Sequence, residues 1–511
     1  MQSKFRLILN LFSKFKMSLD NAEKDALYSK ISEGKAQAYF HKTKNQVFYN
    51  PIQEFNRDLS ISVLNTYSRV NDSKKLKILE ALAASGIRSM RYALEVDNVE
   101  EILANDFDQK AVDLIEENKK LNNVEHLVKS SCDDATILMN SMSRNWKTKF
   151  DCIDLDPYGT PASFLDSAVR SIRSGGILLV TATDAGVLCG NGADTCFTKY
   201  GSVSLRTPCC HELALRILLQ SISSHAARYS KYIVPVLSLS IDFYFRLFVL
   251  VYDGQMKAKE SINDIGFFHI CPECHTFYEQ KYGKTVPTKG NVKFIFDSTS
   301  EYNLTKCQNC EATLKLVGPV WTGKLHDKIF IQNILSYLAT KNDKDFKTIE
   351  RMVGMLNLAC EELDNPLYYI LDDICSVMHC QTPNHNVMRS AIMNCNYQVS
   401  YSHCAKNSIK TDAPSHVIWD ILKRWVELKP VGEKWLKPEN RVFKILKNQA
   451  KINVDFTVRN DCTPISKQNN LLRYQEPPPF WGPGSKPKRK SENEHSDNKN
   501  EKTKKTTDLS K

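Results

Sequence analysis

Short apolar runs alternate with amphipathic helical patterns from residue 76 to about residue 230. The predicted strands cover residues 75–82, 100–106, 150–156 and 175–183. The predicted helices between them cover residues 86–96, 108–122 and 161–172. Strands and helices in alternation are typical of a mostly parallel sheet with helices on both faces. The sequence therefore predicts an α/β, Rossmann-like sheet for this part of the chain.

The pattern changes after residue 230. Two strand-like runs at 231–254 precede two pairs of cysteines, and helical patterns such as 326–339 and 415–428 dominate from residue 325 onwards. The Pro/Gly-rich and then highly charged C-terminal segment has too little apolar surface to fold, so we expect disorder there. The predicted organisation is a leader at residues 1–25, an α/β domain at 26–230, an α+β C-terminal domain with both cysteine pairs at 231–475, and a basic tail at 476–511.

Composition narrows the class of protein only a little. The 511 residues are enough for two or more domains, and no apolar stretch is long enough to span a bilayer. Lys and Arg outnumber Asp and Glu by 69 to 58, a balance that suits a polyanionic partner but is shared by many enzymes. Sixteen cysteines in a large chain without a secretory signal favour reduced thiols and a metal site over disulfides.

Both ends of the chain carry patterns of targeting signals. The first sixteen residues are basic, lack acids and place Phe5, Leu9 and Phe12 at helical spacing, which is typical of a mitochondrial leader; the alternative is a frayed N-terminus. The run "KPKRK" at 486–490 resembles a nuclear localisation signal, although short basic runs also occur by chance. These patterns predict a distribution between nucleus and mitochondrion.

Acidic residues stand at four successive strand ends, the third of which is marked by "CDDATILM" at 132–139. The acids at these ends are Glu80, Asp106, one of Asp133 and Asp134, and Asp156. The first strand leads into a turn of small residues before Gly86 and Arg88. Each acid alone is better explained as a helix cap or a solvated turn. Because ligands bind beyond the carboxyl ends of parallel strands, the four together predict a nucleoside ligand with a small carboxylate-bearing tail, S-adenosylmethionine.

The fourth strand ends in Asp156-Pro157-Tyr158, which is similar to the acid-Pro-Pro-aromatic motif of amino methyltransferases. Strand alternation places Asp154 on the same face as Asp156, opposite Ile153 and Leu155. A carboxylate that accepts the N–H groups of an exocyclic base amine increases its nucleophilicity and can take its proton, and an aromatic ring can stack on the base. The alternative is a tight turn with a buried acid.

From about residue 30 to 460 the chain resembles the tRNA guanine-26 N2-dimethyltransferase family of class I S-adenosylmethionine-dependent methyltransferases. The resemblance rests on "VFYNPIQEFNRDLSI", "EALAASGIRSMRYALE", "ANDFDQKAV", "CDDA", "DLDPYGTP", "TATDAGVLCG", "YGSVSLRTPCCHELALR" and "IKTDAPSHVIWDIL". It implies transfer of one or two methyl groups to N2 of guanosine 26 in tRNA, with residues 231–475 as the domain that binds tRNA. It implies cofactor contacts by Arg57, Arg88, Asp106, Asp134 and Ala135, a catalytic Asp156, and base contacts by Tyr158 and Phe48.

The segment around residues 181–212 is a second candidate for substrate contacts. Arg206, His211 and Glu212 are candidate RNA contacts. Pro208-Cys209 also matches the nucleophile motif of C5-pyrimidine methyltransferases, which attack the base with a thiolate. The Asp-Pro-Tyr strand end suits an amine instead, so the covalent mechanism is disfavoured.

Two C-x-x-C pairs, Cys271 with Cys274 and Cys307 with Cys310, predict a closed, structural zinc site with four thiolate ligands. Free buried thiols are the alternative, and His275 is a substitute ligand. The Lys- and Gly-rich segment between the pairs is a candidate for contact with RNA phosphates.

Two other functional classes remain open for the whole protein: a DNA or protein-glutamine amino methyltransferase, and a tRNA-binding chaperone that has kept the methyltransferase fold. The sequence leaves the oligomeric state open.

Overall fold

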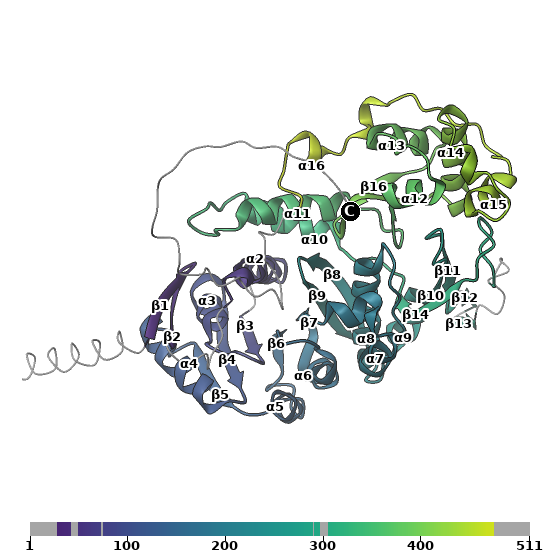
Figure 1. Ribbon diagram of the computed structural model, residues 1–511. Helices are drawn as coiled ribbons and strands as arrows, with labels where there is room; N and C mark the ends of the chain where they lie inside the picture. The colour runs from purple at the N-terminus through teal and green to yellow at the C-terminus, as the bar shows by residue number, and fades with distance from the viewer. Residues whose placement is uncertain (1–27, 42–49, 73–74, 290, 297–304, 475–511) are drawn as a thin grey trace, which may run out of the picture. The chain divides into compact units, whose positions relative to one another are not determined.

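A seven-stranded sheet organises the first half of the chain (Figure 1). The structure is a computed structural model that describes residues 28–41, 50–72, 75–289, 291–296 and 305–474. The strand order is β5-β4-β3-β6-β7-β9-β8, and the strands are β3 (Leu76–Glu80), β4 (Val99–Asp106), β5 (Val128–Cys132), β6 (Phe150–Leu155), β7 (Ile172–Ala182), β8 (Lys231–Ile241) and β9 (Tyr244–Asp253). The first five strands in this order are parallel, and β9 is antiparallel to both of its neighbours. The chain order reverses between β3 and β6, where ligands bind in doubly wound sheets.

The strands expected from the sequence are confirmed, with two differences in extent. Strand β7 begins at Ile172, three residues before the predicted start at Gly175. Its register with β6 shifts in this early part, where Gly175 adopts a φ of 80°. Strands β8 and β9 lie beyond residue 230 but belong to the same sheet, which therefore ends at Asp253. The change of pattern at residue 230 marks a switch to a β-hairpin, and the division into domains stays a prediction.

Helices cover both faces of the sheet (Figure 1). One apolar cluster joins Ile153 and Leu155 to α5 (Ala135–Met142), α6 (Leu165–Ser171) and α8 (Cys210–Ala227). The other joins Cys152 to helices on the opposite face, namely α2 (Glu54–Val70), α3 (Ile87–Glu95), α4 (Gln109–Asn122), α10 (Lys328–Leu338) and α11 (Ile349–Glu361). Successive residues of β6 thus enter different clusters, as the alternation of a strand requires.

The remaining elements lie outside this sheet. A hairpin of β1 (Tyr28–Glu33) and β2 (Ala36–His41) precedes it, followed by the short helix η1 (Pro51–Gln53). The other strands are β10 (Ile265–Ile270), β11 (Phe277–Lys281), β12 (Gly283–Thr288), β13 (Asn291–Phe296), β14 (Lys315–Trp321), β15 (Tyr369–Ile370), β16 (Val399–Ser402) and β17 (Ala405–Thr411). The other helices are η2 (Ala162–Phe164), η3 (Val187–Asn191), α7 (Ala193–Tyr200), α9 (Gln255–Glu260), η4 (Ser261–Asp264), α12 (Leu371–Met378), α13 (His385–Asn394), α14 (Ser415–Leu428), η5 (Glu433–Trp435), α15 (Arg441–Lys447), η6 (Asn460–Cys462) and α16 (Ile465–Gln468). No helix in the described ranges has the length and apolar character needed to cross a membrane.

Candidate active site

A pocket of about 180 Å³ opens at the carboxyl ends of β3, β4 and β6. Its lining includes Asn50, Arg57, Glu80, Ala83, Ala84, Ser85, Arg88, Asp106, Phe107, Asp156, Pro157, Tyr158 and Thr183. Three of the four acids that the sequence placed at strand ends therefore meet in one pocket, because parallel strands end at the same edge of a sheet.

The turn between β3 and α3 forms the floor of the pocket. Gly86 caps α3 with a φ of 71°, and a Cβ on this residue would lie 3.0 Å from Cγ1 of Ile115. Ala84 also has a positive φ, and its N–H donates to Oδ2 of Asp106 at 2.8 Å. The turn is thereby fixed to the end of β4. Its small side chains leave the main chain accessible to a ligand.

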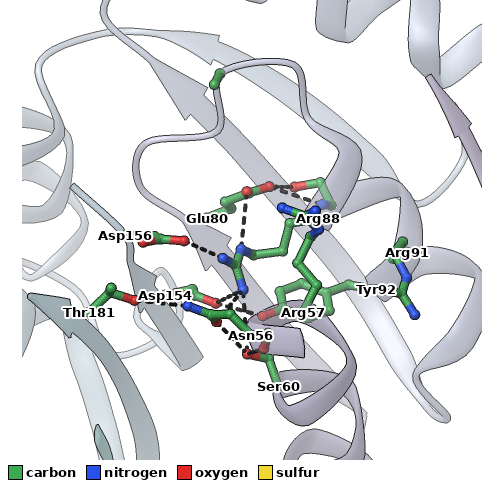
Figure 2. A network of polar contacts seen from close by, with 12 residues as sticks. Asn56, Arg57, Ser60, Glu80, Arg88, Arg91, Tyr92, Asp154, Asp156 and Thr181 are labelled. Atoms are coloured by element: carbon green, nitrogen blue, oxygen red, sulfur yellow. Dashed lines mark hydrogen bonds and ion pairs between the residues drawn. The ribbon is translucent and has the colours of Figure 1, made fainter. Parts of the chain in front are cut away.

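Arg88 connects the acids at the pocket floor (Figure 2). Its guanidinium is buried and forms an ion pair with Asp156, lies 3.5 Å from Oδ2 of Asp154, and lies 3.7 Å from Oε1 of Glu80. These acids raise the pKa of Arg88 against the opposing effect of its burial. Burial raises the pKa of Glu80 to about 8, although Arg88 opposes this shift. Arg88 therefore fixes the orientation of Asp156 by a direct contact.

Asp154 supports the site from within the protein core. It is fully buried, receives hydrogen bonds from both Nη atoms of Arg246 at 2.9 and 2.8 Å, and accepts one from the hydroxyl of Tyr92 at 2.6 Å. Burial alone would raise the pKa of Asp154, but the charges of Arg246 and Arg88 lower it below its usual range. The sequence left the role of Asp154 open, and the structure places it as an anchor for Arg88 outside the pocket lining.

Asp156 and Tyr158 lie at the mouth of the pocket. The side chain of Asp156 is 20% exposed, and Tyr158 is 80% exposed, so its ring is accessible to a planar partner. The loop that carries them is held by Gly159, whose N–H donates to Oγ1 of Thr183 at 2.7 Å, while Thr183 N–H donates to the Gly159 carbonyl at 2.8 Å. This pair of hydrogen bonds ties the Asp-Pro-Tyr loop to the end of β7.

Arg57 enters the pocket from α2. Its Nε and Nη2 donate to the two carboxylate oxygens of Glu33 at 2.5 Å each, and Nη2 also donates to the Asn50 carbonyl at 3.2 Å. Burial would raise the pKa of Glu33, but Arg57 and Arg91 lower it overall. Arg57 thus lines the pocket while it joins the β1–β2 hairpin to α2.

Three other predicted site residues, Asp134, Ala135 and Arg206, lie outside the pocket lining. Asp134 caps α5, where it accepts from the N–H groups of Thr136 and Ile137 at 2.8 and 3.1 Å. Asp134, the adjacent Ala135 and the exposed Arg206 are not among the described residues that line the pocket. Phe48 falls outside the described residues. The roles of these four residues stay predictions.

Sequence reasoning missed Phe107 and Arg246. Phe107 is 77% exposed and lines the pocket directly after Asp106. A large aromatic residue immediately after a strand-end acid is a local signal that could have identified it. Arg246 had no such signal, because it lies 92 residues after its partner Asp154.

The four cysteines of the two C-x-x-C pairs converge in the structure. All four are buried, their sulfur atoms lie within 4.8 Å of one another, and the Sγ–Sγ distance is 3.4 Å both for Cys271 with Cys310 and for Cys274 with Cys307. The residue after each pair, His275 or Glu311, adopts a positive φ near 60°. His275 is not part of this cluster of metal-ligating atoms in the described chain.

Comparison with known proteins agrees with this geometry. The profile of the N2,N2-dimethylguanosine tRNA methyltransferase family matches residues 28–423. The chain is 42% identical to the tRNA (guanine(26)-N(2))-dimethyltransferase of Drosophila melanogaster, with 86% of this chain and 84% of the relative covered. It is 39% identical to the protein of the same name from Mus musculus, with 89% and 76% covered.

A solved structure is also similar along most of the chain. Trm1 from Pyrococcus horikoshii, in complex with S-adenosyl-L-methionine, is 30% identical and superposes with a TM-score of 0.65, covering 77% of this chain and 99% of that one. The family profile includes the whole pocket described above, from Asn50 to Thr183. Fold, pocket and sequence therefore agree, and the chain belongs to the N2,N2-dimethylguanosine tRNA methyltransferase family.

Proposed function

We propose that this protein transfers one or two methyl groups from S-adenosylmethionine to the exocyclic N2 of guanosine 26 in tRNA. The observation that carries the proposal is the placement of Asp156 and the exposed ring of Tyr158 together at the mouth of the pocket, within a chain of this family. The relatives from Drosophila melanogaster and Mus musculus are both named as dimethyltransferases that act on N2 of guanine 26 in tRNA.

The donors in the pocket fit S-adenosylmethionine. The Asp106 carboxylate suits the ribose hydroxyls, and the exposed Phe107 ring suits the adenine. Arg57, which also pairs with Glu33, lines the pocket as the candidate contact for the carboxylate of the methionine end. When bound, the cofactor supplies an electrophilic methyl group on a sulfonium. The turn at Ala83–Ser85 lets the main chain approach such a ligand closely.

In this proposal, Asp156 acts on the guanine amine. Its carboxylate accepts the N–H bonds of the amine, which directs the nitrogen lone pair toward the methyl group and provides an acceptor for the released proton. Arg88 holds the carboxylate in place, and Tyr158 stacks on the base. After one transfer the amine still has one N–H for Asp156, so the same contact can serve a second transfer.

The experiment that tests the proposal is mass spectrometry of nucleosides from an unmodified tRNA incubated with the protein and S-adenosylmethionine. We expect N2-methylguanosine and N2,N2-dimethylguanosine, and a transcript with adenosine in place of guanosine 26 should yield neither. Methylation of DNA or of a glutamine peptide instead of the tRNA would favour the other amino methyltransferases. Binding of tRNA without methylation would favour the chaperone.

We further infer that Cys271, Cys274, Cys307 and Cys310 hold one structural zinc ion. Four buried thiols within 4.8 Å of one another suit a tetrahedral, closed site. Next to the site, the indole N–H of Trp419 on α14 donates to Oγ1 of Thr276 at 2.7 Å. A metal at the four cysteines would therefore stabilise the packing of α14 against the two knuckles.

Replacing both Cys271 and Cys307 with serine should remove one equivalent of zinc per chain and lower the melting temperature. Metal analysis by mass spectrometry and thermal unfolding measure the two effects. The matched control replaces Cys132 and Cys360, which belong to no metal-ligating group in the described chain, and should change neither quantity. Unchanged zinc in the Cys271/Cys307 variant would contradict the site.

The hairpin of β12 and β13 is a candidate surface for tRNA phosphates. Lys284 pairs with Ile295 and Lys293 with Val286, so both lysines stand on the same face, and both are exposed. Replacing both with glutamine should weaken tRNA binding and reduce the slope of log K against log salt by about 2. Replacing the exposed Lys120 and Lys344 serves as the control for charge; an equal loss there would argue against a specific contact.

We also propose that the protein is shared between nucleus and mitochondrion. The support is the basic leader and the run at 486–490, both outside the described residues. Fluorescent fusions with Lys486–Lys490 neutralised should lose nuclear signal, and fusions without residues 1–16 should lose mitochondrial signal. An unchanged nuclear signal in the first fusion would contradict the nuclear assignment, and an unchanged mitochondrial signal in the second would contradict the mitochondrial one.

A further inference from the structure

A second group of metal-ligating side chains lies apart from the four-cysteine cluster. The Sγ atoms of Cys189 and Cys210 and one ring nitrogen of His211 all lie within 4.8 Å of one another. Each residue is half-buried. Cys189 belongs to the π-helical turn η3 that follows β7, whereas Cys210 and His211 are the first two residues of α8.

The segment that leads into α8, residues 204–209, is held against η3 without any metal. Gly190, next to Cys189, has a φ of 100°, and a Cβ there would lie 2.1 Å from the Arg206 nitrogen, so only glycine permits this approach. Oγ of Ser204 donates to the Val187 carbonyl at 2.8 Å. The Cys210 N–H donates to the Thr207 carbonyl at 3.0 Å. The ligands are therefore presented by a turn and a helix start that already pack against each other.

The surroundings of His211 suit a ligand to a metal. Its Nδ1 lies 3.1 Å from Oγ of Ser240, and the N–H of Ser240 donates to Nε2 of His403 at 3.2 Å. When Nδ1 of His211 donates to the serine oxygen, the lone pair of Nε2 is available to a metal. Metal-bound histidines commonly donate their second ring N–H to a neighbouring acceptor in this way.

We propose that Cys189, Cys210 and His211 bind a thiophilic divalent metal ion such as Zn²⁺. Two thiolates and one imidazole are a donor set that zinc accepts, and a fourth position remains for water or an exogenous ligand. The ion fastens η3 to the start of α8. Because η3 begins four residues after Thr183, which lines the pocket, the ion also restricts the segment that leaves the active site.

The test is metal content of the full-length protein, purified under reducing conditions and loaded with Co²⁺ or Zn²⁺ alone. We expect two equivalents per chain in the wild type and one in Cys189→Ala. The Cys271→Ser/Cys307→Ser variant should still bind one Co²⁺, with absorption from sulfur-to-cobalt charge transfer. Adding Cys189→Ala to that variant should abolish the absorption. This readout does not depend on methyl transfer, so it stands apart from the proposed reaction.

Cys375 and Cys380 provide a matched control. They also form a close pair, with Cys380 Sγ donating to the Cys375 carbonyl at 3.8 Å, but belong to no metal-ligating group in the described chain. Cys380→Ala should therefore leave the metal content unchanged. Equal metal content in wild type and Cys189→Ala would overturn the proposal, as would a Cys189–Cys210 disulfide, found by peptide mapping, in reduced and metal-loaded protein.

Discussion

Asp156→Asn is expected to slow methyl transfer to tRNA by about 10²- to 10⁴-fold while tRNA binding stays within a few-fold of wild type. The amide keeps an oxygen that can accept from Arg88, so the contact that orients residue 156 survives. It cannot take a proton from the guanine amine, and its NH2 group presents donors where the carboxylate presents acceptors. Single-turnover transfer of labelled methyl groups, with a separate tRNA binding titration, measures both quantities.

Asp194→Asn provides the matched control for Asp156. Asp194 is an acid on α7 that does not line the pocket, and the same chemical change there should leave the rate unchanged. Asp156→Ala should be as slow as Asp156→Asn, and Arg88 retains Asp154 and Glu80 in both variants. A wild-type rate in Asp156→Asn would show that another group receives the proton.

Lys410→Met is expected to lower the free energy of unfolding by about 3–5 kcal/mol, the usual range for breaking a buried ion pair. Lys410 lies on β17, and its Nζ lies 3.0 Å from Oε2 of Glu212 on α8 and 2.7 Å from Oε1 of Glu362 after α11. All three side chains are almost fully buried. Without the ammonium, two buried carboxylates face each other, although Glu212 keeps Arg216 and Glu362 keeps His403.

Urea unfolding of a double-mutant cycle measures the Lys410 network. Glu362→Gln combined with Lys410→Met should be less destabilised than the sum of the single variants, because removing both charges leaves less uncompensated charge in the core. Lys120→Met on the exposed face of α4 is the control and should leave the unfolding midpoint unchanged. Additive effects in the cycle would contradict a direct interaction between Glu362 and Lys410.

The sheet and most of the pocket follow from local signals in the sequence. Apolar runs that end in Glu80, Asp106 and Asp156 predict parallel strands, and parallel strands bring their carboxyl ends to one edge. The pairing of Cys271 with Cys274 and of Cys307 with Cys310 likewise predicted the four-thiol cluster. Each of these signals depends on residues within one strand end or one turn, so it can be recognised before the fold is known.

The contacts between side chains that hold these local pieces in place were identified only in the folded chain. Helix α2 was not predicted from the sequence. It is buried along most of its length, so its polar residues do not gather on one exposed face and give no amphipathic pattern. Arg88 contacts Asp156 from 68 residues away, Arg246 contacts Asp154 from 92, and Lys410 contacts Glu212 from 198. An ion pair between distant residues leaves no periodicity in the sequence. Its partners are selected by the geometry of the folded core, where a buried charge requires an opposite charge nearby.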